Sequence, residues 1–282
     1  MSSDIVHGKA DVNGTRLHYV TAGTGEPLLL LHGFPQTWYE WREVIPRLAE
    51  HYRVIAPDYR GAGDSARPVD GYDKATMAAD VVALADVLAP GERLRVVGHD
   101  MGAFVAYSVA AHHRDRVRAL GLVDAPVPGT AAWEELRSNP RVWHVAFHGA
   151  RDVAEMLVAG RERAYLTQFY ELRAHHPHLV MPALDVYLRT YAAPGGMRAA
   201  FEAYRALPQD AEVNKGLLRT PLAIPVLLVA GASSNSAPLL EAMGPDLGPD
   251  VSFALVEEAG HWIPEEQPAA FLAALEPFLA QA

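Results

Sequence analysis

One aspartate stands where its carboxylate could act as a nucleophile. Asp100 lies in the segment 96–102, VVGHDMG, between an apolar run and a stretch rich in alanine. A strand that turns sharply into a helix, with glycines beside the turn residue, exposes that residue's side chain at the end of the strand. A serine there would attack acyl groups, whereas an aspartate attacks carbon and leaves an ester on the protein. The segment therefore predicts that a carbon atom becomes esterified to Asp100.

A histidine that could hydrolyse such an ester follows the last apolar run of the chain. His261 lies between Gly260 and Trp262, shortly after the predicted strand 253–256. A histidine at this edge of the sheet could deprotonate water for attack on the ester carbonyl. Its place after the nucleophile and the acid matches the chain order in which such groups occur. We therefore predict that His261 is the general base.

The histidine needs a carboxylate to orient it and to stabilise its cation. The usual place is the loop after the predicted strand 226–230, but this loop reads GASSNS and contains no carboxylate. Asp124, at the end of the preceding predicted strand, is the remaining candidate. A capping role in a turn or helix is the alternative for this residue. We favour Asp124 as the orienting acid.

A second glycine turn could supply backbone donors to the ester. The sequence HGFP at 32–35 follows the predicted strand 28–31. The N–H groups of Phe34 and Met101 would then form an oxyanion hole for the tetrahedral intermediate. A plain strand-to-helix turn is the alternative.

The elements that must position these residues form an alternating pattern of strands and helices. Asn13-Gly14 between apolar residues predicts an opening β-hairpin. The later apolar runs predict strands at 28–31, 54–56, 94–97, 120–123, 226–230 and 253–256, and helices at 38–50, 74–88 and 101–113. Such alternation indicates a mainly parallel sheet covered on both faces.

The alternation stops between Asp124 and Pro225, where no convincing strand run occurs. Helical stretches such as 152–169 and 197–206 predict an insertion above the strand ends, which would act as a lid. A separate helical domain is the alternative.

Composition excludes several classes of function. The formal net charge of −10 argues against nucleic acid as a partner, because a phosphate-binding surface needs positive charge. With no cysteine, the chain offers no disulfide, thiol nucleophile or thiolate metal site. The first residues lack the apolar core of a signal peptide, and no run is long enough to span a membrane. We expect a cytoplasmic protein, as a monomer or homodimer.

Taken together, these segments resemble the α/β-hydrolase family from Leu28 to about Phe278. The combination of HGFP, RGAGDS at 60–65, GHDMG at 98–102 and Gly260-His261 carries the resemblance, although RGAGDS is expected only to shape a loop. The resemblance implies a mainly parallel eight-stranded sheet with helices on both faces and a helical cap inserted after strand 6. It places the core at 1–125 and 212–282 and the cap at 126–211.

Within that family, an aspartate nucleophile indicates epoxide hydrolases or dehalogenases. The segment 34–41, FPQTWYEW, is similar to the epoxide hydrolase branch, and the resemblance implies a cis bond before Pro35. One bacterial subgroup pairs a lid histidine with a tyrosine to open the ring, in patterns similar to 142–147 and 201–207. By this resemblance His144 and Tyr204 are the ring-opening pair and Asp124 is the charge-relay acid. Helix capping and ordinary packing are the alternatives for His144 and Tyr204.

Dehalogenases are the main rival. Fluoroacetate dehalogenases resemble this pattern but hold a carboxylate substrate with two arginines, where this chain has Met101 and Phe104. They also carry a halide-binding tryptophan where Val145 stands, and haloalkane dehalogenases usually carry one at the position of Met101. These departures favour an epoxide hydrolase, with a dehalogenase or a catalytically inactive ligand-binding relative as alternatives.

The resemblance thus implies that water opens a small hydrophobic epoxide to a vicinal diol through an alkyl-aspartate ester. It implies no metal, no organic cofactor and no membrane partner. The aromatic and apolar residues expected to line the substrate pocket are Trp38, Phe104, Trp143, Phe147 and Trp262.

Overall fold

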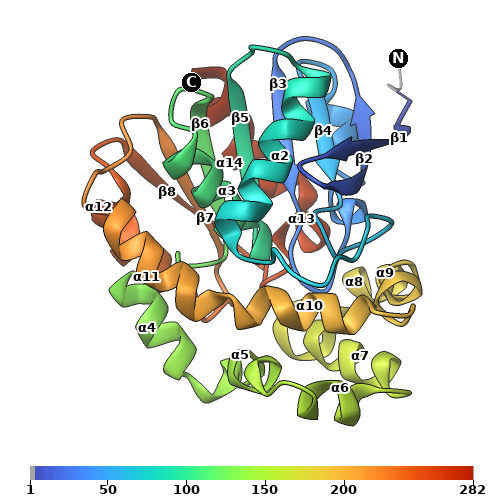
Figure 1. Ribbon diagram of the computed structural model, residues 1–282. Coiled ribbons are helices and arrows are strands. Elements are labelled where there is room, and N and C mark those ends of the chain that lie inside the picture. The colour runs from blue at the N-terminus through green and yellow to red at the C-terminus, as the bar shows by residue number, and fades with distance from the viewer. Residues whose placement is uncertain (1–3, 282) are drawn as a thin grey trace.

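A mixed sheet forms the centre of the molecule in the computed structural model, which describes residues 4–281 (Figure 1). Within these residues the sheet has eight strands in the order β1-β2-β4-β3-β5-β6-β7-β8. The strand β2 pairs antiparallel with β1 and β4, and the strands from β4 to β8 pair parallel. The sheet confirms the predicted fold class. The strands are β1 (Val6–Val12), β2 (Thr15–Ala22), β3 (Pro27–Leu31), β4 (Arg53–Pro57), β5 (Leu94–His99), β6 (Val117–Val123), β7 (Val226–Gly231) and β8 (Val251–Val256).

The first two strands form the predicted hairpin. Val12 pairs with Thr15, so that only Asn13 and Gly14 make the turn. Both turn residues have positive φ angles, 45° and 75°, as a tight hairpin turn of this hand requires.

The central strands are apolar throughout because helices cover both faces of the sheet. Successive side chains of a strand point to opposite faces. In β3, Leu29 and Leu31 join the hydrophobic cluster under α2 (Lys74–Leu88) and α3 (Met101–His112), whereas Leu28 and Leu30 join the cluster under α14 (Pro268–Gln281). Figure 1 shows α2 and α3 in front of the sheet and α14 behind it.

Two of the predicted helices are broken in the structure. The segment 38–50 contains only the 3₁₀ turn η1 (Trp38–Trp41) and the short α1 (Ile45–Leu48). Pro46 lies in the first turn of α1, where its missing N–H is tolerated, and it could not continue a helix from η1. The segment 152–169 divides into α6 (Val153–Val158) and α7 (Glu162–Arg173) around Gly160, whose φ is 76°. The predicted helix 74–88 is confirmed by α2.

An insert of helices between β6 and β7 forms the cap, as predicted. It lies below the sheet in Figure 1. The predicted cap end at residue 211 falls inside its last helix, α11. The elements of the insert are α4 (Ala131–Ser138), η2 (Pro140–Val142), α5 (His144–Gly149), α6, α7, α8 (Pro177–Val180), η3 (Met181–Ala183), α9 (Leu184–Tyr191), α10 (Gly196–Arg205) and α11 (Leu207–Leu217).

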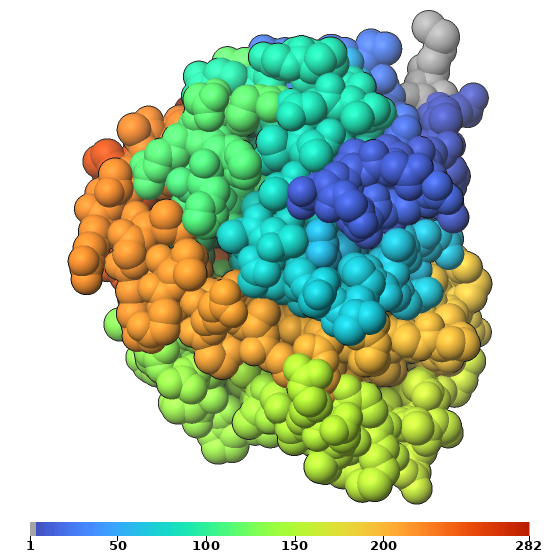
Figure 2. Space-filling view, viewed as in Figure 1, coloured from blue at the N-terminus to red at the C-terminus, as the bar shows by residue number. Residues whose placement is uncertain are grey.

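Charged contacts fasten the cap to the core. Figure 2 shows the cyan surface of the chain after β4 lying against the yellow and orange surface of the cap. There Arg189 makes a bidentate pair with Asp64, at 3.0 and 2.9 Å. The ammonium of buried Lys74 donates to the carbonyl of Ala203 at 2.7 Å and to the carboxylate of Asp210 at 3.1 Å. Across residues 4–281, no helix has both the length and the apolar character needed to cross a bilayer.

Candidate active site

Asp100 occupies the sharp turn between β5 and α3. Its φ and ψ are 49° and −118°, a conformation that a non-glycine residue adopts only when its surroundings impose it. Glycines make the turn possible, since a Cβ at Gly98 would lie 2.2 Å from the carbonyl oxygen of Gly102, and one at Gly102 would lie 2.1 Å from that of Leu31. The turn presents the Asp100 carboxylate to a cavity, where Oδ1 accepts the Phe34 N–H at 2.9 Å.

The structure brings His261 and Asp124 to this carboxylate. His261 Nε2 lies 3.3 Å from Asp100 Oδ2, and His261 Nδ1 lies 2.6 Å from Asp124 Oδ2. The same Asp124 oxygen accepts the hydroxyl of Ser234 at 2.7 Å. The polar loop after β7 thus holds the acid that comes from the end of β6. The three residues form the chain of contacts that a nucleophile, a base and an orienting acid require.

The electrostatics of this group keep Asp100 ionised. Burial raises the pKa of Asp100, but the hydrogen bond and charge of His261 outweigh burial and hold that pKa well below its usual range. The charge of His99 acts in the same direction. Asp100 is therefore a carboxylate at neutral pH, the form that attacks carbon.

A buried ion pair that sequence reasoning missed lies beneath the nucleophile. His99 Nδ1 is 2.9 Å from Glu40 Oε1, and His99 Nε2 is 2.9 Å from the carbonyl oxygen of His261, which accepts its N–H. The other Glu40 oxygen accepts the Gly33 N–H at 2.9 Å. Burial lowers the pKa of His99, but the charge of Glu40 prevails and raises it to about 9. This pair joins the loops of Phe34, Asp100 and His261.

Both members of the pair stand inside motifs that the sequence already presents, WYEW and GHD. Nothing in their spacing indicates that they meet, because the contact depends on how η1 folds back against the end of β5. The available signal was the charge of Glu40 between two aromatic residues, Tyr39 and Trp41.

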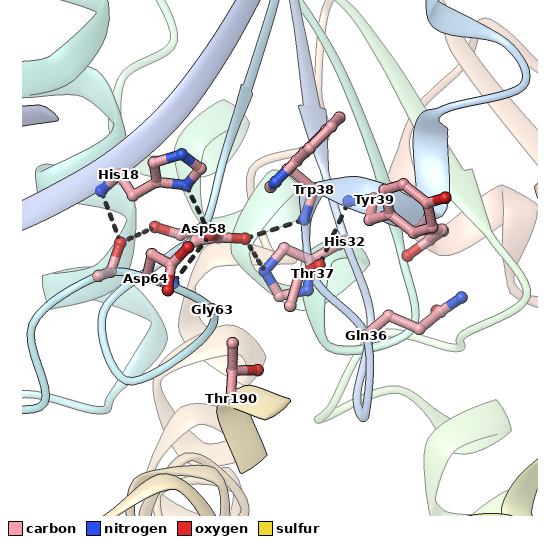
Figure 3. A network of polar contacts seen from close by, with 12 residues as sticks. His18, His32, Gln36, Thr37, Trp38, Tyr39, Asp58, Gly63, Asp64 and Thr190 are labelled. Carbon is pink, nitrogen blue, oxygen red and sulfur yellow. Dashed lines mark hydrogen bonds and ion pairs between the residues drawn. The ribbon is translucent and has the colours of Figure 1, made fainter. Parts of the chain in front are cut away.

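Asp58 contacts both His32 and Trp38, at the two ends of the loop that carries Phe34 (Figure 3). Asp58 Oδ1 accepts the Trp38 N–H at 2.9 Å, and its Oδ2 contacts His18 Nδ1 at 2.7 Å and accepts the Asp64 N–H at 3.1 Å. A Cβ at Gly63 would lie 2.0 Å from the Asp58 carboxylate, so the RGAGDS segment wraps this group closely. The Phe34–Pro35 peptide bond is cis, which confirms the expectation from the resemblance.

A cavity of about 500 Å³ lies between the core and the cap. Of the pocket residues predicted from the sequence, Phe104 and Trp143 line it, together with Asp100, His261 and Asp124. Sequence reasoning missed other lining residues, which come from separate parts of the cap or from the loop after β7: Trp133, Leu136, Arg141, Gln168, Phe169, Leu172, Arg173 and Asn235.

Three residues predicted for the pocket lie elsewhere. Trp38 packs edge-on against the ring of His7, at 5.2 Å between ring centroids, and its backbone N–H binds Asp58. Trp262 is fully buried and stacks on Tyr170 at 4.7 Å. Phe147 packs inside the cap against Tyr165, at 5.8 Å between ring centroids. In each case the side chain packs against a neighbouring aromatic ring and does not line the cavity.

The predicted ring-opening pair faces the cavity from the cap. His144 and Tyr204 both line it, with ring centroids 5.7 Å apart. Within the described chain, His144 Nδ1 is buried without a hydrogen-bond partner. Burial lowers the pKa of His144 well below its ordinary value and raises that of Tyr204 well above. At neutral pH the cavity therefore meets a neutral imidazole and a protonated phenol, both able to donate a hydrogen bond.

Within residues 4–281, no group of three or more histidine, aspartate and glutamate side chains is arranged to hold a metal ion.

Comparisons with known proteins place this chain in a family. The model of the alpha/beta hydrolase fold matches residues 26–268. The chain is 40% identical to the soluble epoxide hydrolase of Corynebacterium sp. (strain C12), with 95% of each chain covered. It is 31% identical to epoxide hydrolase A of Mycobacterium tuberculosis, again with 95% of each chain covered.

Solved structures agree with these matches. The structure of Cfl2 from Burkholderia cenocepacia is similar with a TM-score of 0.88 at 40% identity, and the alignment covers 96% of this chain and 95% of that one. The epoxide hydrolase CorEH is similar with a TM-score of 0.86 at 35% identity and 99% coverage of both chains. The chain therefore belongs to the α/β-hydrolase family and, within it, to the epoxide hydrolase group.

Proposed function

We propose that this protein hydrolyses an epoxide to a vicinal diol through a covalent ester of Asp100. The observation that carries the proposal is the placement of the Asp100 carboxylate between the Phe34 N–H, at 2.9 Å, and His261 Nε2, at 3.3 Å. One oxygen is thus held by a backbone donor and the other faces the base. Such an arrangement suits a carboxylate that is first alkylated and then regenerated.

In the first step, Asp100 Oδ2 attacks an epoxide carbon and the ring C–O bond breaks. The electron pair of that bond goes to the epoxide oxygen, which takes a proton from Tyr204 and accepts a hydrogen bond from His144. Tyr204 suits this role because its phenol is protonated at neutral pH. Oδ1 becomes the ester carbonyl oxygen and remains on the Phe34 amide, with the Met101 amide as the proposed second donor.

In the second step, His261 takes a proton from water and the hydroxide adds to the ester carbonyl carbon. Asp124, 2.6 Å from His261 Nδ1, stabilises the imidazolium that forms. The tetrahedral intermediate collapses by breaking the bond to the alkyl oxygen, which leaves with the hydroxyl proton as the diol. The proton on His261 returns to Tyr204 through solvent, and Asp100 is a carboxylate again.

The cavity wall favours an epoxide over a halide as the leaving group. Phe104 and Val145, at the positions where dehalogenases of this family carry arginine and tryptophan, are apolar lining residues. Phe104 offers no positive charge to the carboxylate of a haloacid, and Val145 offers no N–H to a departing halide ion. His144 and Tyr204 can donate to an alkoxide on a carbon that stays attached.

Trapping the ester tests the proposal. His261→Gln should accumulate an adduct equal to one molecule of styrene oxide, found on the peptide that contains Asp100 by mass spectrometry. Asp100→Asn serves as the control and should show no adduct. A wild-type enzyme that makes diol while His261→Gln forms no adduct would refute the ester mechanism. Fluoride release from fluoroacetate without diol formation would replace the proposed reaction with dehalogenation.

A further inference from the structure

The cavity contains an arginine whose place is fixed by the catalytic loop. Arg173 ends α7 of the cap, and its carbonyl oxygen accepts the His261 N–H at 2.9 Å. The fit there is close, since a Cβ at Gly260 would lie 2.2 Å from the same oxygen. The residue also lines the cavity that Asp100 faces.

The guanidinium of Arg173 has no ion-pair or hydrogen-bond partner in the described chain. Elsewhere in residues 4–281 every arginine side chain has such a partner except Arg219, which is exposed on the surface. Arg173 differs from Arg219 in being partly buried. A partly buried charge without a partner is costly unless a ligand supplies the opposite charge. Although the chain has a net charge of −10, none of the described carboxylates forms an ion pair with the Arg173 guanidinium.

The charge of Arg173 acts on the reacting groups. After burial, it is the largest influence lowering the pKa of His144, and it also contributes to lowering the pKa of Asp100. A ligand group that neutralises Arg173 would lie in the cavity that Asp100 also lines.

The rest of the wall indicates what kind of anion fits. The lining combines polar groups with large apolar side chains, among them Phe104, Trp133, Trp143, Phe169 and Leu172. Leu172 is 75% exposed and marks the mouth, where Arg141 is tied to Asn235 at 3.1 Å. A cavity of about 500 Å³ accepts a ligand much longer than a simple epoxide. This combination suits an apolar chain that carries a single charged group.

We propose that the substrate is an epoxide on an apolar chain ending in a carboxylate, which Arg173 binds while the ring reaches Asp100. The inference rests on the proposed function and adds a charged group to the small hydrophobic epoxide expected from the sequence. The absence of arginine at Met101 and Phe104 means that the carboxylate is not held directly beside the nucleophile. It is held instead from the cap, at the end of α7.

Paired substrates test this assignment. An ω-epoxy alkanoate and its methyl ester, in a short series of chain lengths, differ only in the charge at the far end. Wild type should prefer the acid by about 10- to 100-fold in kcat/KM, the usual value of a charge-assisted pair. Arg173→Met should abolish the preference mainly through KM, and Arg173→Lys should restore part of it.

Arg219→Met is the matched control, because it removes an arginine outside the cavity and should keep both the rates and the preference. A wild type that does not distinguish acid from ester overturns the proposal. So does an Arg173→Met variant that loses the same factor on both substrates, since Arg173 would then serve only to seat the cap on the His261 loop.

Calorimetry with octanoate separates failure of the subsite from failure of the reaction. Octanoate has no epoxide, so its binding does not depend on turnover. A wild type that hydrolyses neither epoxide can still bind octanoate about 10-fold or more tightly than the Arg173→Met variant does. That result would support the carboxylate subsite and refute the proposed reaction. Equal binding of octanoate to both proteins, or none to either, overturns the subsite.

Discussion

Replacing Glu40 with glutamine removes one charge from beneath the nucleophile and changes little else in shape. The glutamine oxygen can still accept the Gly33 N–H that Glu40 binds at 2.9 Å. The side chain can no longer balance a positive charge on His99, which is completely buried. Burial then lowers the pKa of His99 and the ring loses its proton. A neutral ring has only one N–H. It can no longer donate hydrogen bonds both to the side chain at position 40 and to the His261 carbonyl.

The size of the effect follows from the pKa of His99, which is about 9 in the folded protein against an ordinary value of 6.5. This difference corresponds to about 3 kcal/mol of folding free energy. A raised pKa stabilises fully below the unfolded value, so the contribution is complete below about pH 6.5 and is lost as the pH rises to about 9. Glu40→Gln should therefore be less stable than wild type by about 3 kcal/mol near pH 6, and the gap should close toward pH 9.

Urea unfolding of both proteins at a series of pH values measures this gap. Glu43→Gln is the control, since Glu43 is exposed and pairs with Arg42 at 3.3 Å on the surface. That variant should track wild type at every pH. A gap between Glu40→Gln and wild type that stays constant from pH 6 to 9 would refute the argument, because Glu40 would then act by packing and not by keeping His99 protonated.

Three further results are expected. Asp124→Asn should slow ester hydrolysis by about 10³-fold or more while the ester still forms, so that single-turnover mass spectrometry shows it accumulating; a variant that fails to form the ester contradicts the assigned role. Tyr204→Phe should slow ester formation by about 10²-fold in rapid-quench experiments and leave hydrolysis of a preformed ester unchanged, whereas equal slowing of both steps would point to a packing role. Gly102→Ala should cost more than about 2 kcal/mol in unfolding free energy, because its Cβ would lie 2.1 Å from the Leu31 carbonyl oxygen; a wild-type melting temperature would contradict this.

Sequence patterns predict best those features that depend on the geometry of neighbouring residues. The turn at Asp100 is local, because two glycines and a strand before a helix suffice to expose the side chain. The pairing of His261 with Asp124 was predicted because the loop after β7 contains no carboxylate. In the structure this loop contributes Ser234, whose hydroxyl binds Asp124.

Contacts between distant segments decide the rest. The helix predicted at 38–50 is absent because Asp58 binds the Trp38 N–H and Pro46 cannot continue a helix from η1, neither of which the hydrophobic pattern encodes. The aromatic residues Phe147 and Trp262 stand beside functional positions, but their direction depends on the rings they meet in the cap and beside it. Arg173 lies in no motif, and only the docked cap brings it to the cavity.

The hydrogen bond from the His261 amide to the Arg173 carbonyl ties the base to the covering helices. Any wide swing of α7 away from the sheet would loosen the loop that carries the base, so an enzyme with its cover removed should lose ester turnover as well as substrate selectivity. Chimaeras that exchange covering helices between relatives would have to transfer the end of α7 together with the Gly260 loop as one unit. Variation in what this protein accepts is therefore best sought in side chains that point inward, with that backbone junction left untouched.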